Sequence, residues 1–284
     1  MSTVPDVVGV IGGGRMGAGI AQVFAAAGAA VTIAESDSNG AAAATERVAR
    51  GVARAADRQS LAADPDAILA RVRAVTSLTE LPPDAGLIVE AVPERLADKI
   101  AVLSTAEKVA APGAVLASNT SSLSIAELGA ALEHPRRFLG MHFFNPVPPS
   151  SLVEVVRAPD TDGSIVKDVL DWVHALGKSE VLVRDSPGFA TSRLGVALGL
   201  EAIRMLEEQV ADAESIDRAM ELGYRHPMGP LRSTDLVGLD VRLAIAEHLH
   251  TTLGERFRPP QLLRDKVSRG ELGRKSGLGF YPWP

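Results

Sequence analysis

The sequence predicts an α/β fold with a doubly wound, mostly parallel sheet, followed by an all-helical domain. Short apolar strands alternate with helical segments from residue 7 to about residue 184, and this alternation is typical of a parallel sheet with helices on both faces. After residues 185–188, Asp-Ser-Pro-Gly, the strand pattern stops and the apolar spacing becomes helical. We therefore predict two domains, 1–184 and 185–284.

The first elements form a predicted βαβ unit. Val7–Ile11 is a β-branched run of the kind found in strands buried on both faces. The alanine-rich, proline-free segment Arg15–Ala27 is predicted to be a helix that Gly28 closes, and Ala30–Ala34 the second strand. Further strands are expected at about 74–76, 87–91, 114–118, 138–143, 152–157 and 181–183, and helices at about 40–58, 96–109, 164–176, 194–206, 215–222, 239–253 and 261–269.

Composition excludes several classes of function. The net charge of -6 offers no basic stripe for a nucleic-acid backbone, so no nucleic-acid partner is expected. The chain has 0 cysteines, which excludes disulfides and thiolate chemistry. The first residues lack the pattern of a signal peptide, and no apolar stretch reaches the length of a membrane span. We expect a cytoplasmic protein without a membrane partner.

A glycine-rich loop lies between the first predicted strand and helix. Residues 12–17, Gly-Gly-Gly-Arg-Met-Gly, fit the pattern G-x-G-x-x-G. In a βαβ unit, Gly12 allows the tight turn, Gly14 lets the backbone approach a pyrophosphate, and Gly17 allows close packing of helix on strand. With Met16, these residues predict a dinucleotide site at the helix N-terminus. The alternative is a glycine-rich turn that holds no ligand.

The residue at the end of the second strand selects the cofactor. Glu35 lies roughly 20 residues after the loop, where a carboxylate accepts hydrogen bonds from ribose hydroxyls. Residues 36–39 include no arginine or lysine that could receive a 2′-phosphate. The cofactor is therefore predicted to be NAD. Alternatively, Glu35 is a solvated acid at a strand end, or Asp37 shares its role.

Two polar segments lie at the carboxyl ends of later predicted strands. In open α/β sheets, ligands and catalytic residues are found at these ends. They are residues 118–123, Ser-Asn-Thr-Ser-Ser-Leu, and 142–148, His-Phe-Phe-Asn-Pro-Val-Pro. Oxidation of a hydroxyl needs a base, and His142 is the candidate. Glu154 is expected to return on the neighbouring strand and bind the other ring nitrogen, which fixes the tautomer. The alternative is a buried structural histidine with its partner.

These segments resemble the L-3-hydroxyacyl-CoA dehydrogenase family, of the 3-hydroxybutyryl-CoA dehydrogenase type, in order and spacing over residues 6–282. The other matching segments are 12–21, 89–94, 152–155, 185–189 and 273–281. The resemblance implies a Rossmann-type NAD-binding domain and a helical domain for substrate and dimerisation. It also implies transfer of a hydride from the 3-hydroxyl of a short (S)-3-hydroxyacyl-CoA to NAD, the same His–Glu pair, a homodimer and a place in fatty acid β-oxidation.

The resemblance implies further site residues. Ser121 is similar by position to a serine that contacts the substrate oxygen, although it, Ser122 or Ser124 could equally be the N-cap of a helix over 124–132. Asn145 resembles a contact on the nicotinamide side that also meets the substrate. The residues implied to contact the nucleotide, each of which could instead be an ordinary surface charge, are Glu94, Lys99 and Lys275.

The chain departs from the family at one substrate position. Ser192 stands where the family's commonest pattern has an asparagine that hydrogen-bonds the carbonyl region of the substrate. Ser192 could act through a water, Thr191 or the substrate could shift to compensate, or the activity could be lower than is typical of the family. Arg50, Arg54 and Arg58 recur on one helical face, which could meet the phosphates of CoA or be a solvated basic face.

No metal is expected, because hydride passes to the cofactor. His248 and His250 are two residues apart and therefore lie on different faces of a helix. The alternatives for function are dehydrogenases of free hydroxy acids, of the gulonate 3-dehydrogenase (lambda-crystallin) or carnitine 3-dehydrogenase type, and a silent NAD-binding structural paralogue.

Overall fold

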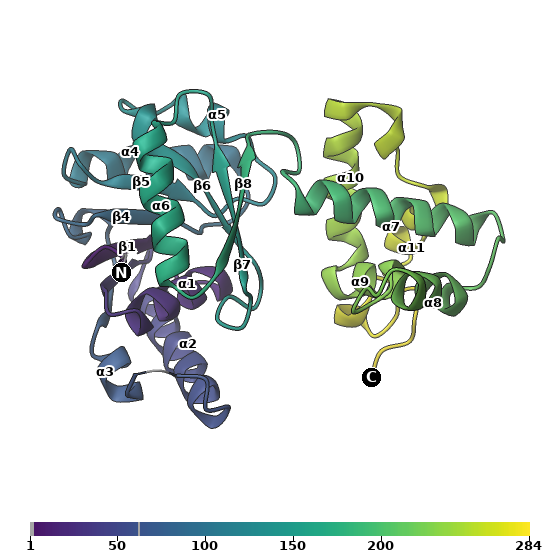
Figure 1. Cartoon of the computed structure of the whole chain (residues 1–284), viewed down its shortest axis with the longest axis horizontal. Helices are drawn as coiled ribbons and strands as arrows, with labels where there is room; N and C mark the ends of the chain where they lie inside the picture. The colour runs from purple at the N-terminus through teal and green to yellow at the C-terminus, as the bar shows by residue number, and fades with distance from the viewer. Residues whose placement is uncertain (1–2, 62) are drawn as a thin grey trace. The chain divides into compact units, whose positions relative to one another are not determined.

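A computed structural model describes residues 3–61 and 63–284, and the chain divides into two units, Met1–Asp185 and Ser186–Pro284. The predicted boundary between residues 184 and 185 lies one residue from this division. Figure 1 labels most of the helices and strands of both units. Within the described ranges, no helix is both long and apolar enough to cross a membrane.

The first unit is built on one sheet with the order β3-β2-β1-β4-β5-β6-β7-β8. Its strands are β1 (Val7–Ile11), β2 (Ala30–Ala34), β3 (Val72–Val75), β4 (Leu87–Glu90), β5 (Val115–Ser118), β6 (Phe138–Phe143), β7 (Leu152–Arg157) and β8 (Ser179–Arg184). All neighbouring strands are parallel except β6 and β7. The predicted doubly wound, mostly parallel sheet is confirmed. The chain leaves β1 toward β2 on one side and continues with β4 on the other, and ligands bind at the carboxyl ends of strands at such a switch point.

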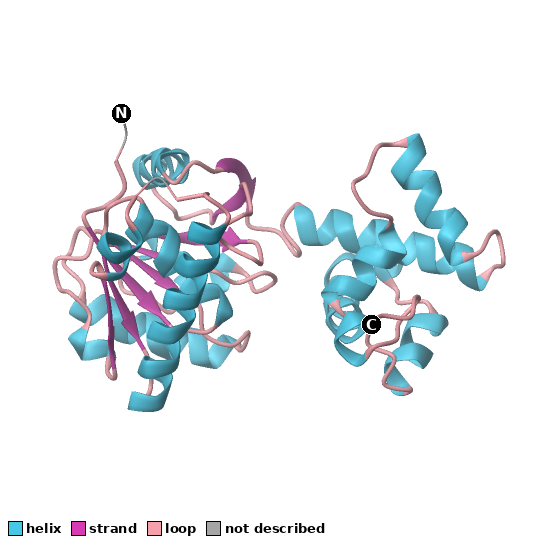
Figure 2. Cartoon of the chain, turned by 90° about the horizontal axis from the view of Figure 1, so that it is seen from below, coloured by secondary structure: helices cyan, strands magenta, loops and turns pink. Residues whose placement is uncertain are grey.

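Helices lie on both sides of this sheet (Figure 2). They are α1 (Arg15–Ala26), α2 (Ser38–Asp57), α3 (Pro65–Leu69), α4 (Leu96–Val109), α5 (Ile125–Gly129) and α6 (Gly163–Ala175), with the 3-10 turns η1 (Leu78–Glu80) and η2 (Pro135–Arg137). The sequence interpretation omits α3. Local signals for it exist, because Asp64 caps its N-terminus and Pro65 occupies its first turn.

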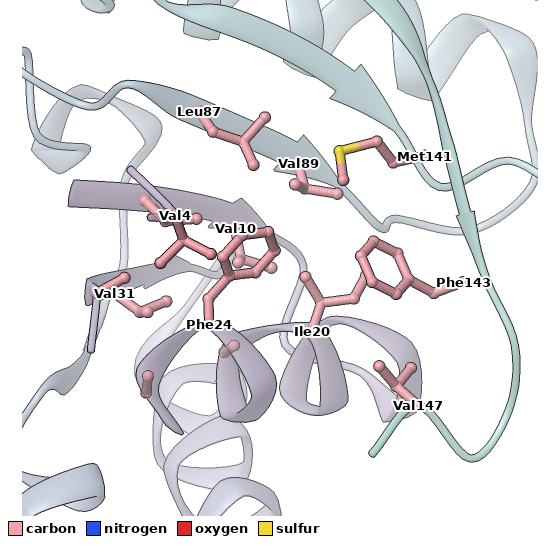
Figure 3. Packing of buried hydrophobic residues seen from close by; sticks show 14 of the residues in the cluster. Val4, Val10, Ile20, Phe24, Val31, Leu87, Val89, Met141, Phe143 and Val147 are labelled. Atoms are coloured by element: carbon pink, nitrogen blue, oxygen red, sulfur yellow. The ribbon is translucent and has the colours of Figure 1, made fainter. Parts of the chain in front are cut away.

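The core on one face of the sheet depends on α1. Ile20 and Phe24 point from α1 toward the sheet, where Val10, Val89 and Phe143 meet them (Figure 3). The rings of Phe24 and Phe143 meet edge to face, with centroids 6.5 Å apart. Because these side chains are fully or almost fully buried, they fix α1 and the loop before it against the sheet.

The second unit contains helices and loops but no sheet within residues 186–284 (Figure 2). Its elements are α7 (Thr191–Glu207), α8 (Ala213–Gly223), α9 (Pro230–Val237), α10 (Leu239–Leu253), η3 (Glu255–Phe257), α11 (Gln261–Ser268) and η4 (Arg274–Ser276). The all-helical prediction is confirmed, but α9 is missing from it. Pro230 in its first turn and Gly238 at its end are the signals for this helix.

Candidate active site

The glycine loop has the geometry that a pyrophosphate requires. Gly12 has a φ of +90°, and a side chain at Gly17 would overlap the carbonyl oxygen of Gly12. At Gly14, by contrast, an added carbon would meet no described atom within 4 Å. No described side chain caps the start of α1, so its first N–H groups can receive a phosphate. Met16, in the first turn of α1, packs against the core.

Glu35 lies beside this loop, as the NAD interpretation requires. Its Oε1 accepts a hydrogen bond of 2.6 Å from Gly13 N. The carboxylate of Asp37 accepts a 2.7 Å bond from Gly40 N and caps α2. Glu35 is therefore the acid that lies next to the glycine loop, whereas Asp37 caps the N-terminus of α2.

A buried ion-pair cluster lies beyond the end of β4. Lys99 Nζ is 2.7 Å from Glu90 Oε1 and 3.2 Å from Glu94 Oε2, and it donates to Val92 O at 3.1 Å. Glu90 is fully buried and Lys99 is 1% exposed, so the interpretation of Lys99 as an ordinary surface charge is wrong. The ion pair with Lys99 fixes the carboxylate of Glu94. Glu90, which also accepts a 2.6 Å bond from Ser118 Oγ, is a site residue that the sequence argument missed.

Glu94 organises the loop that carries Ser121. Its Oε1 accepts bonds from Thr120 Oγ1 at 2.6 Å, Ser121 N at 2.9 Å and Ser122 N at 3.1 Å. Burial by itself would raise the pKa of Glu94, but the charge of Lys99 and these hydrogen bonds outweigh it, so the pKa lies below its ordinary value. The carboxylate is therefore ionised, and it fixes the loop before any ligand binds.

The alternative role of Ser121 as a helix N-cap is wrong. Ser124 caps α5, since its Oγ accepts a 3.2 Å hydrogen bond from Glu127 N. The hydroxyls of Ser121 and Ser122 instead lie 3.3 and 3.1 Å from Glu94 Oε1. Ser121 thus lies in the ordered loop after β5, and its contact with substrate stays a prediction.

The His142–Glu154 pair is formed by two adjacent strands. His142 on β6 and Glu154 on β7 are direct cross-strand partners, and His142 Nδ1 is 2.7 Å from Glu154 Oε2. Glu154 is fully buried and His142 is 7% exposed. The ring of Phe144 lies 4.4 Å from the imidazole, centroid to centroid. The predicted contact between the two side chains is therefore present, and the imidazole is held in one orientation.

Lys178 holds the loop between these two strands. Its Nζ donates to Ser150 O at 2.5 Å, to Val147 O at 2.8 Å and to Pro148 O at 3.4 Å. Burial lowers the pKa of Lys178. The loop contains Asn145, whose predicted contacts require a fixed backbone. Lys178 is a second residue that sequence reasoning missed.

A basic groove of 860 Å³ lies between α1, α2 and this loop. Its lining includes Asn145 and no carboxylate from the described chain. The basic side chains that line it are Arg15, Arg47, Arg50, Arg54, Arg58 and Lys178. Arg50 also pairs with Glu46 one turn earlier on α2. The predicted basic face of Arg50 and Arg54 therefore borders a groove large enough for part of a nucleotide-containing ligand.

Two predicted site residues belong to the second unit. Ser192 is the second residue of α7 and is half-buried. Lys275 Nζ is 2.6 Å from Asp240 Oδ2. Their contacts with substrate and cofactor stay predictions.

Comparison with known proteins decides the family. The sequence model of the 3-hydroxyacyl-CoA dehydrogenase NAD-binding domain matches residues 7–186, and that of the C-terminal domain matches residues 188–283. The chain belongs to the 3-hydroxyacyl-CoA dehydrogenase family. Its NAD cofactor is thereby confirmed, and the glycine loop and Glu35 are the residues that fit it.

Relatives of this dehydrogenase match it over its whole length. It is 41% identical to a 3-hydroxybutyryl-CoA dehydrogenase of Mycobacterium tuberculosis, with 100% of both chains covered. It is also 41% identical to a probable 3-hydroxybutyryl-CoA dehydrogenase of Bacillus subtilis, over 96% of each. The crystal structure of (S)-3-hydroxybutyryl-CoA dehydrogenase from Ralstonia eutropha superimposes with a TM-score of 0.94, at 37% identity, over 99% of this chain and 100% of that one.

Proposed function

We propose that this dehydrogenase oxidises the 3-hydroxyl of a short-chain (S)-3-hydroxyacyl-CoA with His142 as the catalytic base. The observation that carries the proposal is the contact of 2.7 Å between His142 Nδ1 and Glu154 Oε2. A catalytically inactive NAD-binding protein would not need a histidine base that a buried carboxylate orients.

Each residue of the pair has a distinct task. Because Glu154 engages Nδ1, the hydroxyl proton of the substrate passes to Nε2 of His142. The carboxylate keeps the ring in place and stabilises the imidazolium that forms. Bound NAD supplies the acceptor for the hydride from C3. The Ser121 hydroxyl, on the loop that Glu94 holds, binds the same substrate oxygen.

The basic side chains of the groove support a substrate that carries CoA. CoA carries several phosphates, and guanidinium groups bind phosphate through charge-assisted, often bidentate hydrogen bonds. Arg50 and Arg54 lie on the rim of a groove without a carboxylate among its described lining residues. A free hydroxy acid carries a single carboxylate, which occupies one guanidinium at most, whereas the several phosphates of CoA match a row of arginines, so the thioester is favoured.

The assay for the proposal follows the absorbance of NADH with (S)-3-hydroxybutyryl-CoA. Replacement of His142 by alanine should lower kcat by about 10²–10⁴-fold, the usual contribution of a general base. Binding of NAD, measured by calorimetry, should persist. His248→Ala, at an exposed position on α10, is the control and should leave kcat unchanged. Turnover that survives in His142→Ala would show that another group is the base.

The thioester assignment has its own test. Arg50→Glu combined with Arg54→Glu should raise KM for (S)-3-hydroxybutyryl-CoA about tenfold or more, since two attractive charges become repulsive. KM for the corresponding N-acetylcysteamine thioester, which carries no phosphate, should stay the same. Turnover of free hydroxy acids alone would refute the assignment.

We also propose a cytosolic homodimer formed through the helical unit. Its exposed apolar side chains, Val210, Leu222 and Tyr224, are candidates for the interface. Light scattering should give twice the chain mass for the wild type and the chain mass for Leu222→Asp combined with Tyr224→Asp. A wild-type monomer would contradict the proposal.

A further inference from the structure

The guanidinium of Arg242 lies in a space that a glycine leaves on the neighbouring helix. Arg242 is in the first turns of α10, and Gly195 is in the first turns of α7. A side-chain carbon at Gly195 would lie 3.2 Å from Nη1 and 3.7 Å from Nη2 of Arg242. A side chain at Gly195 would therefore contact the guanidinium closely enough that it must shift by a few tenths of an ångström.

This guanidinium has no partner among the described residues. Its Nε is buried without a hydrogen-bond acceptor, and no described carboxylate forms an ion pair with it. Asp240, two residues earlier, pairs with Lys275 instead. Because arginine keeps its charge in proteins, the cation is partly desolvated and uncompensated. Such an arrangement costs stability unless a ligand supplies the missing charge.

Arg242 packs near the part of α7 that is expected to contact the substrate. Gly195 follows Ser192 by three residues on α7, and residues at this spacing lie on the same helical face. Ser192 is the residue to which the family resemblance assigns the carbonyl region of the substrate. Gly195 and Arg242 are both half-buried. The unpaired guanidinium thus lies one helical turn from the expected substrate contact.

We propose that Arg242 is a specificity-determining residue that binds a carboxylate of the substrate. The inference rests on the proposed function, since it needs Ser192 to face the substrate. A guanidinium binds a carboxylate through two parallel hydrogen bonds. The carboxylate can come from the far end of the acyl chain of a CoA thioester or from a free 3-hydroxy acid.

The test compares substrates that differ in the carboxylate. The wild type should show a kcat/KM about tenfold or more higher with the mono-CoA thioester of 3-hydroxyglutarate than with (S)-3-hydroxybutyryl-CoA. Arg242→Met, which keeps most of the side-chain volume, should abolish that ratio. Free 3-hydroxyglutarate, assayed in parallel, distinguishes the two sources of the carboxylate. Arg218→Met, at an exposed position on α8, should leave the ratio as in the wild type.

Thermal unfolding separates this role from a structural one. Loss of an unpaired, partly desolvated charge should raise the Tm of Arg242→Met above that of the wild type. A lower Tm with an unchanged substrate ratio would overturn the proposal, as would a wild type that prefers the uncharged thioester. If no substrate is oxidised at all, the proposed function fails independently. Glutarate should then still raise the Tm of the wild type but not of Arg242→Met, and an equal shift in both would refute the carboxylate site.

Discussion

Three carboxylates, on strands β4 and β7 and in the loop after β4, contact side chains of other elements. Glu90 and Glu94 surround Lys99, and Glu154 contacts His142. The sequence predicts the pair of His142 and Glu154, because strand spacing alone brings them together. It does not predict that Lys99 is buried, since the helix around it has charged and apolar residues without a clear face. The sequence likewise does not predict the environment of Arg242, because only the folded structure shows a half-buried guanidinium beside Gly195 with its Nε unpaired.

At this scale, the lowered pKa of Glu94 predicts a pH dependence of stability. The folded state favours the carboxylate, so its contribution is complete above the ordinary value of 4.5 and is lost as the pH falls through the lowered pKa. Glu94→Gln should therefore be less stable than the wild type at neutral pH, and the difference should stay constant down to the ordinary pKa of 4.5 and shrink as the pH falls further. Urea unfolding at several pH values measures it. A difference that is constant with pH, or that Glu133→Gln at an exposed position reproduces, would contradict this role.

At the scale of elements, the β6–β7 hairpin carries the His142–Glu154 pair on its strands and borders the basic groove with its loop. One strand carries His142, the proposed base, and the next carries Glu154, and the loop between them carries Asn145 and borders the basic groove. Strand and helix locations follow well from the apolar periodicity. The short helices α3 and α9 do not, because their few residues show too little periodicity, although Pro65 and Pro230 indicate their starts. The role of Lys178 depends on three carbonyl groups that only the folded loop assembles.

Lys178→Met should loosen this loop. The variant loses three charge-assisted hydrogen bonds, and we expect the free energy of unfolding to fall by about 1–3 kcal/mol. KM for the acyl-CoA should rise, because the loop borders the groove. Lys167→Met removes an exposed ion pair with Asp171 and should change stability by less than about 1 kcal/mol. If the two variants are equally stable in urea, the loop does not depend on Lys178.

At the scale of the whole molecule, the two units have separate hydrophobic cores. Phe24 and Phe143 belong to the core of the first unit, and Leu200 and Leu249 to that of the second. The glycine loop, Glu35 and the His142–Glu154 pair are all in the first unit, whereas Ser192 and Arg242 are in the second. The residues proposed to bind NAD and those proposed to recognise the acyl group therefore belong to different units.

We expect residues 1–185, expressed alone, to fold and to bind NAD within about tenfold of the affinity of the full chain, because a unit with its own core can fold independently. Turnover of (S)-3-hydroxybutyryl-CoA should be at least about 10²-fold lower, since substrate positioning is lost. Circular dichroism, calorimetry and the NADH assay measure the three properties. Full turnover by this fragment would show that the helical unit is dispensable for chemistry.

Direct pairing of His142 with Glu154 makes the alignment of two strands a condition for activity. A slip of one residue between β6 and β7 would turn one of these side chains to the opposite face of the sheet. Such a molecule would retain the secondary structure content and NAD affinity of the enzyme without its chemistry. Insertions and deletions in residues 144–151 are therefore constrained by strand alignment as well as by the groove that this loop borders.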